Sequence, residues 1–402
     1  MRYVIFLCAL VTTAVLADEP TLEWYIPGRA SDRLTVDFPI AQSPLLARKD
    51  LVVLAFPPNH ILGSNDKEGR RLWCVPWGLE NIYIDRERSA HKPYLWPDES
   101  RQWGTRAASF AFDVAAERIV AVDSKSGTMC AVDLQRDGFV QWRAFGSESD
   151  EPSLAQFESL GPPCIVGNQA HSLVASDAKI LCCTLDLATG RPLAKFQLAA
   201  APTPHPSLRF SPTRSGTRLI CPCPNGELVA LQESDRRVDW RTKLESGLNC
   251  MYRLESTNRN ILVLCNGTCT CLFSTDGQVA WSRDNLDLSP FVVHVGGVLL
   301  GTNSAIHFVD IATGNTQWTY ELDSDTVIGN GTVHGNALLI PVREKMLIAL
   351  DLKTGALLDR IACKRSMGHL FSIGGSLYSL RASSLEKLSL ATPIRSEGTT
   401  TP

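Results

Sequence analysis

Hydrophobic positions along most of the chain fall in short runs that glycine, asparagine and serine interrupt. Within residues 291–322, the runs "FVVHV", "VLLGT", "AIHFVDI" and "NTQWTYEL" are separated by "GG", "NS" and "ATG". Short β-branched and aromatic runs bounded by turn residues predict strands joined as hairpins. No segment of about 12 residues or more shows a convincing helical period. The pattern therefore predicts an all-β fold.

One of these turns recurs along the chain. The stretch "FVDIATGNTQW" at 308–318 has near copies in "TLDLATGRPLAKF" at 184–196 and "ALDLKTGALLDRI" at 349–361, and related turns lie at Gly69, Gly138, Gly277 and around Asp235. Periods of about 40 residues with four short antiparallel strands each are typical of propeller blades. We therefore expect residues 45–390 to form a single β-propeller of four-stranded antiparallel blades.

The blade number depends on how the ends of the chain are used. Seven repeats can be read, and a degenerate eighth at 369–390 holds about three strands. The N-terminal segment 18–44, with "LTVDF" at 34–38, can supply the missing strand and close the ring, which would protect its edges. This arithmetic predicts eight blades, with seven as the alternative. The tail at 391–402 is predicted to be disordered.

The recurring turn residues have structural roles in this picture. Aspartate can accept hydrogen bonds from backbone N–H groups two or three residues on, and glycine supplies the positive φ of a compact hairpin. Tryptophan four residues after the glycine can fill the wedge between blades. We expect such structural roles for Asp186, Gly190, Asp310, Gly314, Trp318, Asp351 and Gly355.

Two segments interrupt the repeat. Residues 79–107 form an insertion rich in charged and aromatic residues, including Trp96 and Trp103, and residues 199–212 contain four prolines. Loops on a rigid scaffold commonly carry binding sites. We therefore expect the insertion, with its two tryptophans, to be a candidate interaction loop.

Composition and the N-terminus place the protein outside several classes. The net charge of -3 is not that of a nucleic-acid-binding protein, and 44% apolar with 20% charged residues is typical of a globular domain. Residues 1–17 combine one arginine with an apolar run and small residues before Asp18, which predicts a signal peptide. No second segment of membrane length follows. We expect an exported protein, periplasmic or extracellular, with no integral membrane segment in its mature form.

The motif "LD-L-x-T-G-x-x-x-W" resembles the pyrroloquinoline-quinone-type propeller repeat, which is similar to the WD40 repeat in architecture. The resemblance covers most of residues 45–390. Such repeats occur in quinoprotein alcohol dehydrogenases and in exported proteins that bind no quinone, such as the propeller of the outer-membrane barrel assembly machinery. The resemblance implies the fold strongly and the activity weakly.

An adjacent cysteine pair, Cys182–Cys183, resembles the vicinal disulfide that quinoprotein dehydrogenases pack against the quinone. Here the pair lies in "ILCCTLDLATG", inside a predicted strand. Successive side chains of a strand point to opposite faces, so we expect the two sulfurs to diverge.

Other cysteines are spaced to share one face of a strand, namely Cys221 with Cys223 and Cys269 with Cys271. They can be buried as small hydrophobic residues, joined as disulfides between blades, or brought together as a four-thiolate metal site. His294 and His334 occupy similar places in successive repeats and can face the central channel.

Two functions remain open at this point. The first is an exported, non-enzymatic propeller that binds proteins or peptides as an interaction or assembly scaffold, with no cofactor. The second is a quinone-dependent dehydrogenase with pyrroloquinoline quinone and calcium over the central channel. No catalytic or metal-ligating residue can be assigned from the sequence.

Overall fold

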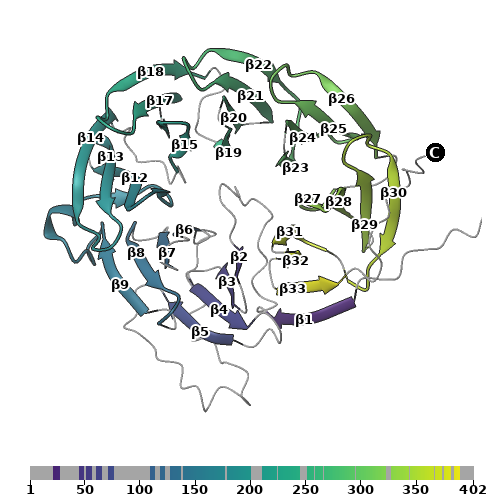
Figure 1. Cartoon of the computed structure of the whole chain (residues 1–402), viewed down its shortest axis with the longest axis horizontal. Coiled ribbons are helices and arrows are strands. Elements are labelled where there is room, and N and C mark those ends of the chain that lie inside the picture. The colour runs from purple at the N-terminus through teal and green to yellow at the C-terminus, as the bar shows by residue number, and fades with distance from the viewer. Residues whose placement is uncertain are drawn as a thin grey trace, which may run out of the picture.

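The computed structural model describes the strands and most of the turns of residues 109–389, and only strands before them. The described residues are 21–27, 45–48, 51–56, 60–65, 71–76, 109–113, 118–122, 127–136, 139–176, 179–200, 211–223, 225–244, 251–257, 259–265, 267–294, 296–322, 327–343, 345–365, 367–373, 375–381 and 384–389. Their strands form small sheets arranged in a ring (Figure 1).

The described strands make up eight sheets, numbered I to VIII along the chain. Sheet I has β2 (Leu45–Arg48), β3 (Leu51–Phe56), β4 (His60–Asn65) and β5 (Arg71–Pro76); sheet II has β6 (Ser109–Asp113), β7 (Arg118–Val122), β8 (Met129–Asp133) and β9 (Phe139–Ala144); sheet III has β10 (Glu158–Ser159), β11 (Cys164–Val166), β12 (Gln169–Ser176), β13 (Lys179–Asp186) and β14 (Pro192–Ala200); sheet IV has β15 (Thr213–Ser215), β16 (Arg218–Pro222), β17 (Glu227–Gln232) and β18 (Val238–Lys243).

The second half of the ring continues in the same way. Sheet V has β19 (Met251–Ser256), β20 (Asn260–Cys265), β21 (Thr268–Phe273) and β22 (Val279–Arg283); sheet VI has β23 (Asp287–His294), β24 (Gly297–Gly301), β25 (Ala305–Asp310) and β26 (Thr316–Glu321); sheet VII has β27 (Thr332–His334), β28 (Ala337–Val342), β29 (Met346–Asp351) and β30 (Leu357–Ala362); sheet VIII has β31 (His369–Ile373), β32 (Ser376–Arg381), β33 (Ser384–Ser389) and β1 (Thr21–Pro27).

Strands that follow one another in sequence are neighbours in their sheet, because short hairpins join them. All the pairings are antiparallel, and sheet III differs from the others in that two short strands, β10 and β11, both pair with β12. A short 3₁₀ helix, η1 (Pro152–Leu154), precedes that sheet. The prediction of a propeller built from four-stranded antiparallel blades is confirmed.

Strand β1 joins sheet VIII at the far end of the chain. It pairs antiparallel with β33, with Thr21 opposite Ser389 and Pro27 opposite Ser384. In Figure 1 the purple β1 accordingly lies beside the yellow β33. Residues 34–38, which carry the "LTVDF" strand pattern, lie outside the described residues.

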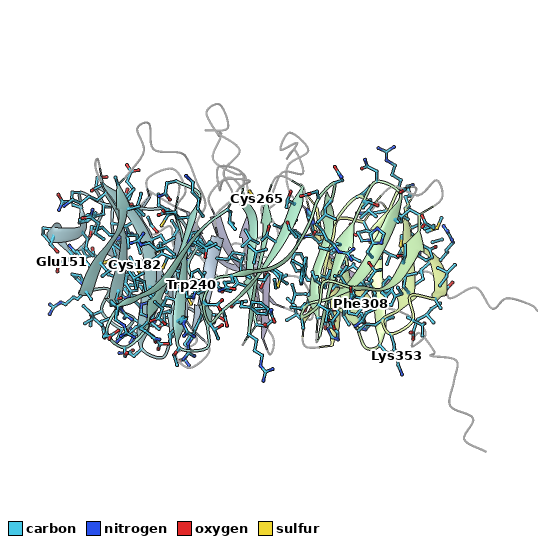
Figure 2. The ribbon with its side chains drawn as sticks, turned by 90° about the horizontal axis from the view of Figure 1, so that it is seen from above. Glu151, Cys182, Trp240, Cys265, Phe308 and Lys353 are labelled. Atoms are coloured by element: carbon cyan, nitrogen blue, oxygen red, sulfur yellow. The ribbon has the colours of Figure 1, made fainter. Side chains whose placement is uncertain are left out.

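The hydrophobic core lies between neighbouring sheets. The middle strands are buried on both faces, as in β28, where all six residues are buried. A strand that packs on both sides has no polar face, which is why these strands read as continuous apolar runs. Figure 2 views the ring from its side, with side chains filling the space between the sheets.

Three predicted features cannot be placed in this fold. The signal peptide at 1–17, the insertion at 79–107 with Trp96 and Trp103, and the tail at 391–402 all lie outside the described residues. Within the part of the chain that is described, no helix has the length and apolar character to cross a membrane.

Candidate functional site

The recurring turns are built by aspartate and threonine side chains. Asp310 Oδ1 accepts hydrogen bonds from the Thr313 N–H at 2.8 Å and from Thr313 Oγ1 at 2.9 Å. The same pair of bonds joins Asp186 to Thr189 and Asp351 to Thr354. Because these bonds favour the charged carboxylate, they hold the pKa of each aspartate below its usual value.

In sheets III, V, VI and VII the glycine of the turn accommodates a tryptophan from the preceding sheet. Gly355 has a φ of 71°, and a Cβ placed on it would lie 2.5 Å from the Trp318 ring. The indole Nε1 of Trp318 donates a hydrogen bond to the Leu352 carbonyl oxygen at 3.0 Å. The turn of sheet VII thus holds the outer strand of sheet VI by a ring contact and a hydrogen bond.

We call this arrangement the Trp–Gly contact. It recurs at three other junctions between sheets, where the indole again donates to a carbonyl oxygen of the next turn. The pairs are Trp142 with Gly190, Trp240 with Gly277, and Trp281 with Gly314.

The junction between sheets III and IV departs from this pattern on both sides. Ala194 of β14 is the register partner of Thr184, directly before the register shift of this strand pair. In sheet VI, Trp318 has the same position relative to the register shift. Ala194 therefore stands where a tryptophan stands in the sheets that form the Trp–Gly contact. Arg236, with a φ of 61°, stands where the next turn has glycine. Its N–H donates to the Gln232 carbonyl oxygen, as the N–H of Gly314 donates to the Asp310 carbonyl oxygen. A non-glycine residue in this conformation is strained, which marks the turn as unusual.

Arg236 links the two sheets in place of the tryptophan. Its guanidinium donates to the Gln169 side chain at 3.1 Å and to the Glu233 carbonyl oxygen. Asp359 takes the tryptophan position in β30 of sheet VII, so that strand also lacks the indole. Among the described turns, however, only that of sheet IV has an arginine in place of the glycine.

The interior of the III–IV junction holds several polar and nucleophilic groups. His171 is fully buried, its Nδ1 lies 3.1 Å from Thr184 Oγ1, and its Nε2 has no hydrogen-bond partner. Burial, reinforced by the nearby Arg236 and Arg214, lowers the pKa of His171 to about 4. Cys164 is the register partner of His171, and burial raises its pKa to about 12.

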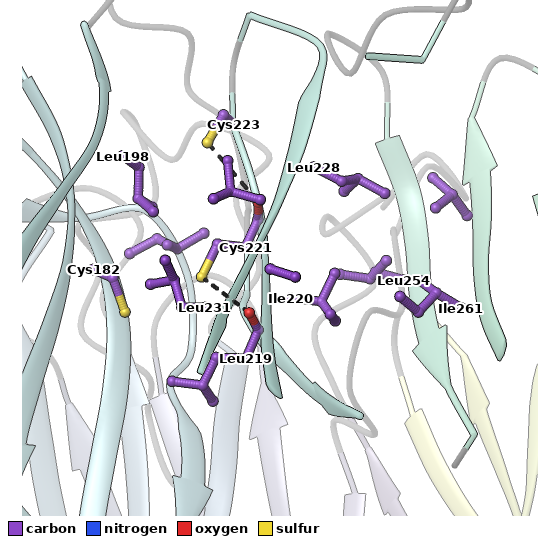
Figure 3. Packing of buried hydrophobic residues seen from close by; sticks show 14 of the residues in the cluster. Cys182, Leu198, Leu219, Ile220, Cys221, Cys223, Leu228, Leu231, Leu254 and Ile261 are labelled. Atoms are coloured by element: carbon purple, nitrogen blue, oxygen red, sulfur yellow. Dashed lines mark hydrogen bonds between the residues drawn. The ribbon is translucent and has the colours of Figure 1, made fainter. Parts of the chain in front are cut away.

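Two further thiols lie deeper in the same junction. Cys182 of β13 and Cys221 of β16 belong to one hydrophobic cluster that spans sheets III, IV and V. Their side chains are hydrogen-bonded to each other. Cys221 Sγ also lies 4.0 Å from the Leu219 carbonyl oxygen, and Figure 3 draws this contact. Cys223 faces the same junction and donates to the Cys221 carbonyl oxygen at 3.9 Å.

The expectation that Cys182 and Cys183 diverge agrees with the structure. Cys182 lies in the cluster between sheets III and IV, whereas Cys183 packs with the residues of sheets II and III. Both are free thiols.

Of the three alternatives for Cys221, Cys223, Cys269 and Cys271, the structure contradicts the four-thiolate metal site. The first pair faces sheet III, while Cys269 and Cys271 face sheet VI, where the Cys271 thiol donates to the Ile311 carbonyl oxygen at 3.5 Å. The two pairs face away from each other, with the body of sheets IV and V between them. All four are buried free thiols, so the interpretation as small hydrophobic residues agrees with the structure.

The two histidines singled out in the sequence lie at the ends of first strands. His294 ends β23 and His334 ends β27, and both strands lie on the inner side of the ring in Figure 1. The Nδ1 of His334 lies 3.0 Å from the Ser372 hydroxyl. Within the described ranges, no group of three or more histidine, cysteine or acidic side chains is arranged to hold a metal ion.

The outer strand of sheet III presents hydrophobic side chains to solvent. Strand β14 is nine residues long, and it carries Leu193, which is 55% exposed. Lys195 is its only charged residue, and it bonds to the Ser153 carbonyl oxygen at 3.1 Å. The strand ends the hydrogen-bonded path of its sheet, so among the described strands none pairs with its outer edge.

These observations define a β-propeller with pyrroloquinoline-quinone-like repeats, and the comparisons with known proteins agree. Residues 183–369 match the family model described as outer membrane protein assembly factor BamB. A search of curated proteins gives no match. The chain is thus a propeller protein that resembles BamB.

Solved structures show the same fold. BamB from Moraxella catarrhalis is 15% identical with a TM-score of 0.59, covering 92% of this chain and 99% of that chain. A quinohemoprotein alcohol dehydrogenase from Pseudomonas putida HK5 is 10% identical with a TM-score of 0.57, covering 95% and 78%. The C-terminal WD40 domain of Sif2 is 9% identical with a TM-score of 0.56, covering 94% and 99%. At these identities the likeness concerns the fold alone.

Sequence reasoning missed the III–IV junction as a site. The signal was present, since the repeat around Asp235 lacks the glycine and Ala194 stands four residues after Gly190. What the sequence did not indicate is that these two departures meet at one junction, beside His171 and the hydrogen-bonded thiols.

Proposed function

We propose that this protein is an exported, non-enzymatic propeller that acts as a scaffold for protein partners, and that sheet III is where a partner binds. The observation that carries the proposal is the outer strand β14. It is long, nearly uncharged and exposed, and it belongs to the sheet at which the repeat departs from its pattern. The resemblance to an assembly factor supports the same function.

The chemistry of β14 fits an extended peptide segment. An outer strand offers a row of backbone N–H and C=O groups, and exposed apolar side chains beside it add buried area when a partner strand is added. Leu193 would lose its solvent contact in such a complex. Sheets with the Trp–Gly contact have shorter outer strands of five or six residues.

A pair of matched variants tests the site. Leu193→Glu places a charge on β14, and Val279→Glu places one on β22, where Val279 is 52% exposed. Partners that co-purify with the full chain from its native host are quantified by mass spectrometry, and a photocrosslinker at position 193 or 279 reports direct contact. We expect loss of the partner and of crosslinking only at position 193. Equal recovery with both variants would refute the site on sheet III.

The insertion offers a second test of the same function. Deletion of residues 79–107 removes Trp96 and Trp103, and partner recovery is then measured as before. Loss of recovery here, with Leu193→Glu unchanged, would keep the scaffold function and move the binding site to the insertion. If no partner is recovered with any form of the protein, the scaffold function itself is refuted.

A further inference from the structure

The III–IV junction contains two thiols on strands of adjacent sheets that face each other. Cys182 is 1% exposed and Cys221 is 0% exposed, and their side chains are hydrogen-bonded to each other. In Figure 3 the two cysteines extend into the same space from sheets III and IV. Strands β14 and β15 and the segment 201–210 lie between them in sequence, so this contact belongs to the tertiary structure alone.

The two sulfurs have different characters. The hydrogen bond from Cys221 lowers the pKa of Cys182, against the effect of burial. The same bond, with burial, raises the pKa of Cys221. The thiolate is the reactive form of cysteine, and Cys182 is the thiol of the pair that converts to it more readily.

The junction around them lacks the feature that ties other sheets together. At four junctions an indole fills the wedge and bonds the next turn, whereas here Ala194 and Arg236 replace both partners. A disulfide requires the two sulfurs to move closer than hydrogen-bond contact, which demands some movement of the sheets. A junction without the tryptophan wedge has more freedom to adjust in this way.

We propose that Cys182 and Cys221 form a paired oxidation site, at which a hydroperoxide converts the two thiols into a disulfide that joins sheet III to sheet IV. The covalent bond would tie the two sheets at a junction that has no Trp–Gly contact. This inference does not depend on the proposed scaffold function, because it concerns only the chemistry of the junction.

The reaction balances with one hydroperoxide molecule. The Cys182 thiolate attacks the terminal peroxide oxygen, the O–O bond breaks, and Cys182 becomes a sulfenic acid while the leaving oxygen takes up a proton. The Cys221 sulfur then attacks the Cys182 sulfur, the S–O bond breaks, and water leaves with the Cys221 proton. With hydrogen peroxide, the two thiols are oxidised by two electrons and the peroxide is reduced to two waters.

The test uses the folded full chain and hydrogen peroxide. After treatment the protein is denatured, its remaining thiols are alkylated, and intact mass and peptide maps are recorded with and without a reductant. We expect two alkylated thiols to be lost and a reducible peptide that links Cys182 to Cys221. We also expect the oxidised protein to melt at a higher temperature than the reduced one.

Three variants decide the outcome. Cys182→Ser and Cys221→Ser should each abolish the linked peptide, and Cys221→Ser should leave Cys182 as a sulfenic acid that dimedone traps. Cys269→Ser, a buried thiol that faces sheet VI, should leave the link unchanged. Circular dichroism verifies each fold, with Cys221→Ala as a substitute if the serine variant unfolds. A linked peptide of a different pair, or no loss of thiols in the wild type, would overturn the proposal.

Discussion

The Trp–Gly contact makes a quantitative prediction that can be isolated within one sheet. Gly335 and Gly355 both lie in hairpins of sheet VII, with φ values of 64° and 71°. A Cβ at Gly335 would meet nothing within 4 Å, whereas a Cβ at Gly355 would lie 2.5 Å from the Trp318 ring. Alanine at the two positions therefore has the same backbone strain and a different steric effect.

The expected magnitudes follow from these two terms. Alanine at positive φ costs about 1–2 kcal/mol, and this term applies to both variants. At Gly355 the ring of Trp318, which is 8% exposed, must also move. It then loses part of the roughly 3–5 kcal/mol that a buried aromatic side chain contributes, and its hydrogen bond to Leu352, worth about 0.5–1.5 kcal/mol. We expect Gly355→Ala to be less stable than Gly335→Ala by about 2–4 kcal/mol.

Urea unfolding followed by far-UV circular dichroism measures the difference, and tryptophan fluorescence of the folded variants reports the indole environment. Gly355→Ala should shift the fluorescence of the native state, and Gly335→Ala should not. If the two variants lose the same stability, the tryptophan contact contributes nothing and our account of the junctions is refuted. Trp318→Phe, which keeps a ring and removes the Nε1 donor, should lie between Gly355→Ala and the wild type.

Three further outcomes are expected. The pKa values of Asp186, Asp310 and Asp351 lie below their ordinary value of 3.8 in the folded protein, so the folded state binds fewer protons than the unfolded state. The stability that the turns contribute is therefore present above about pH 4 and is lost as the pH falls through the folded pKa values. Asp310→Asn should reduce this loss of stability in acid unfolding curves. The pKa of His171 is about 4 in the folded protein and 6.5 ordinarily, so the folded state keeps this histidine neutral and the free energy of unfolding should fall as the pH drops from 6.5 to 4. His171→Gln should make the free energy of unfolding depend less on pH over this range. An unchanged pH dependence would contradict a buried, neutral His171. Pyrroloquinoline quinone added with calcium should give neither the bound-cofactor absorbance nor dye-linked alcohol oxidation, and saturable binding would favour the dehydrogenase function over the scaffold.

The fold could be predicted from the sequence because its information is local and repeated. Each hairpin is specified by an apolar run, a turn such as Asp310 to Gly314, and a second apolar run. Alternation within a strand is also local, and it correctly placed Cys182 and Cys183 on opposite faces.

Predictions that required contacts between sheets succeeded less well. Cys221 and Cys223 were correctly expected to share a face, but the sequence left open whether they are buried as small hydrophobic residues, joined as disulfides or brought together with Cys269 and Cys271. The direction of the ring and the twist of the strands decide which face of a strand meets which neighbouring sheet. Neither can be read from the spacing of residues in the sequence.

The printed sequence is enough to establish the β-propeller fold class, the repeating turn and the positions at which the repeat is altered. Ala194 and Arg236 are visible as exceptions in the printed chain, as is every cysteine. The meeting of these exceptions at one junction, and the contact of Cys182 with Cys221 beside a buried His171, exist only in the folded ring. Hairpins are set by neighbours in sequence, whereas the junction between two sheets is set by side chains that come together only when the ring has formed.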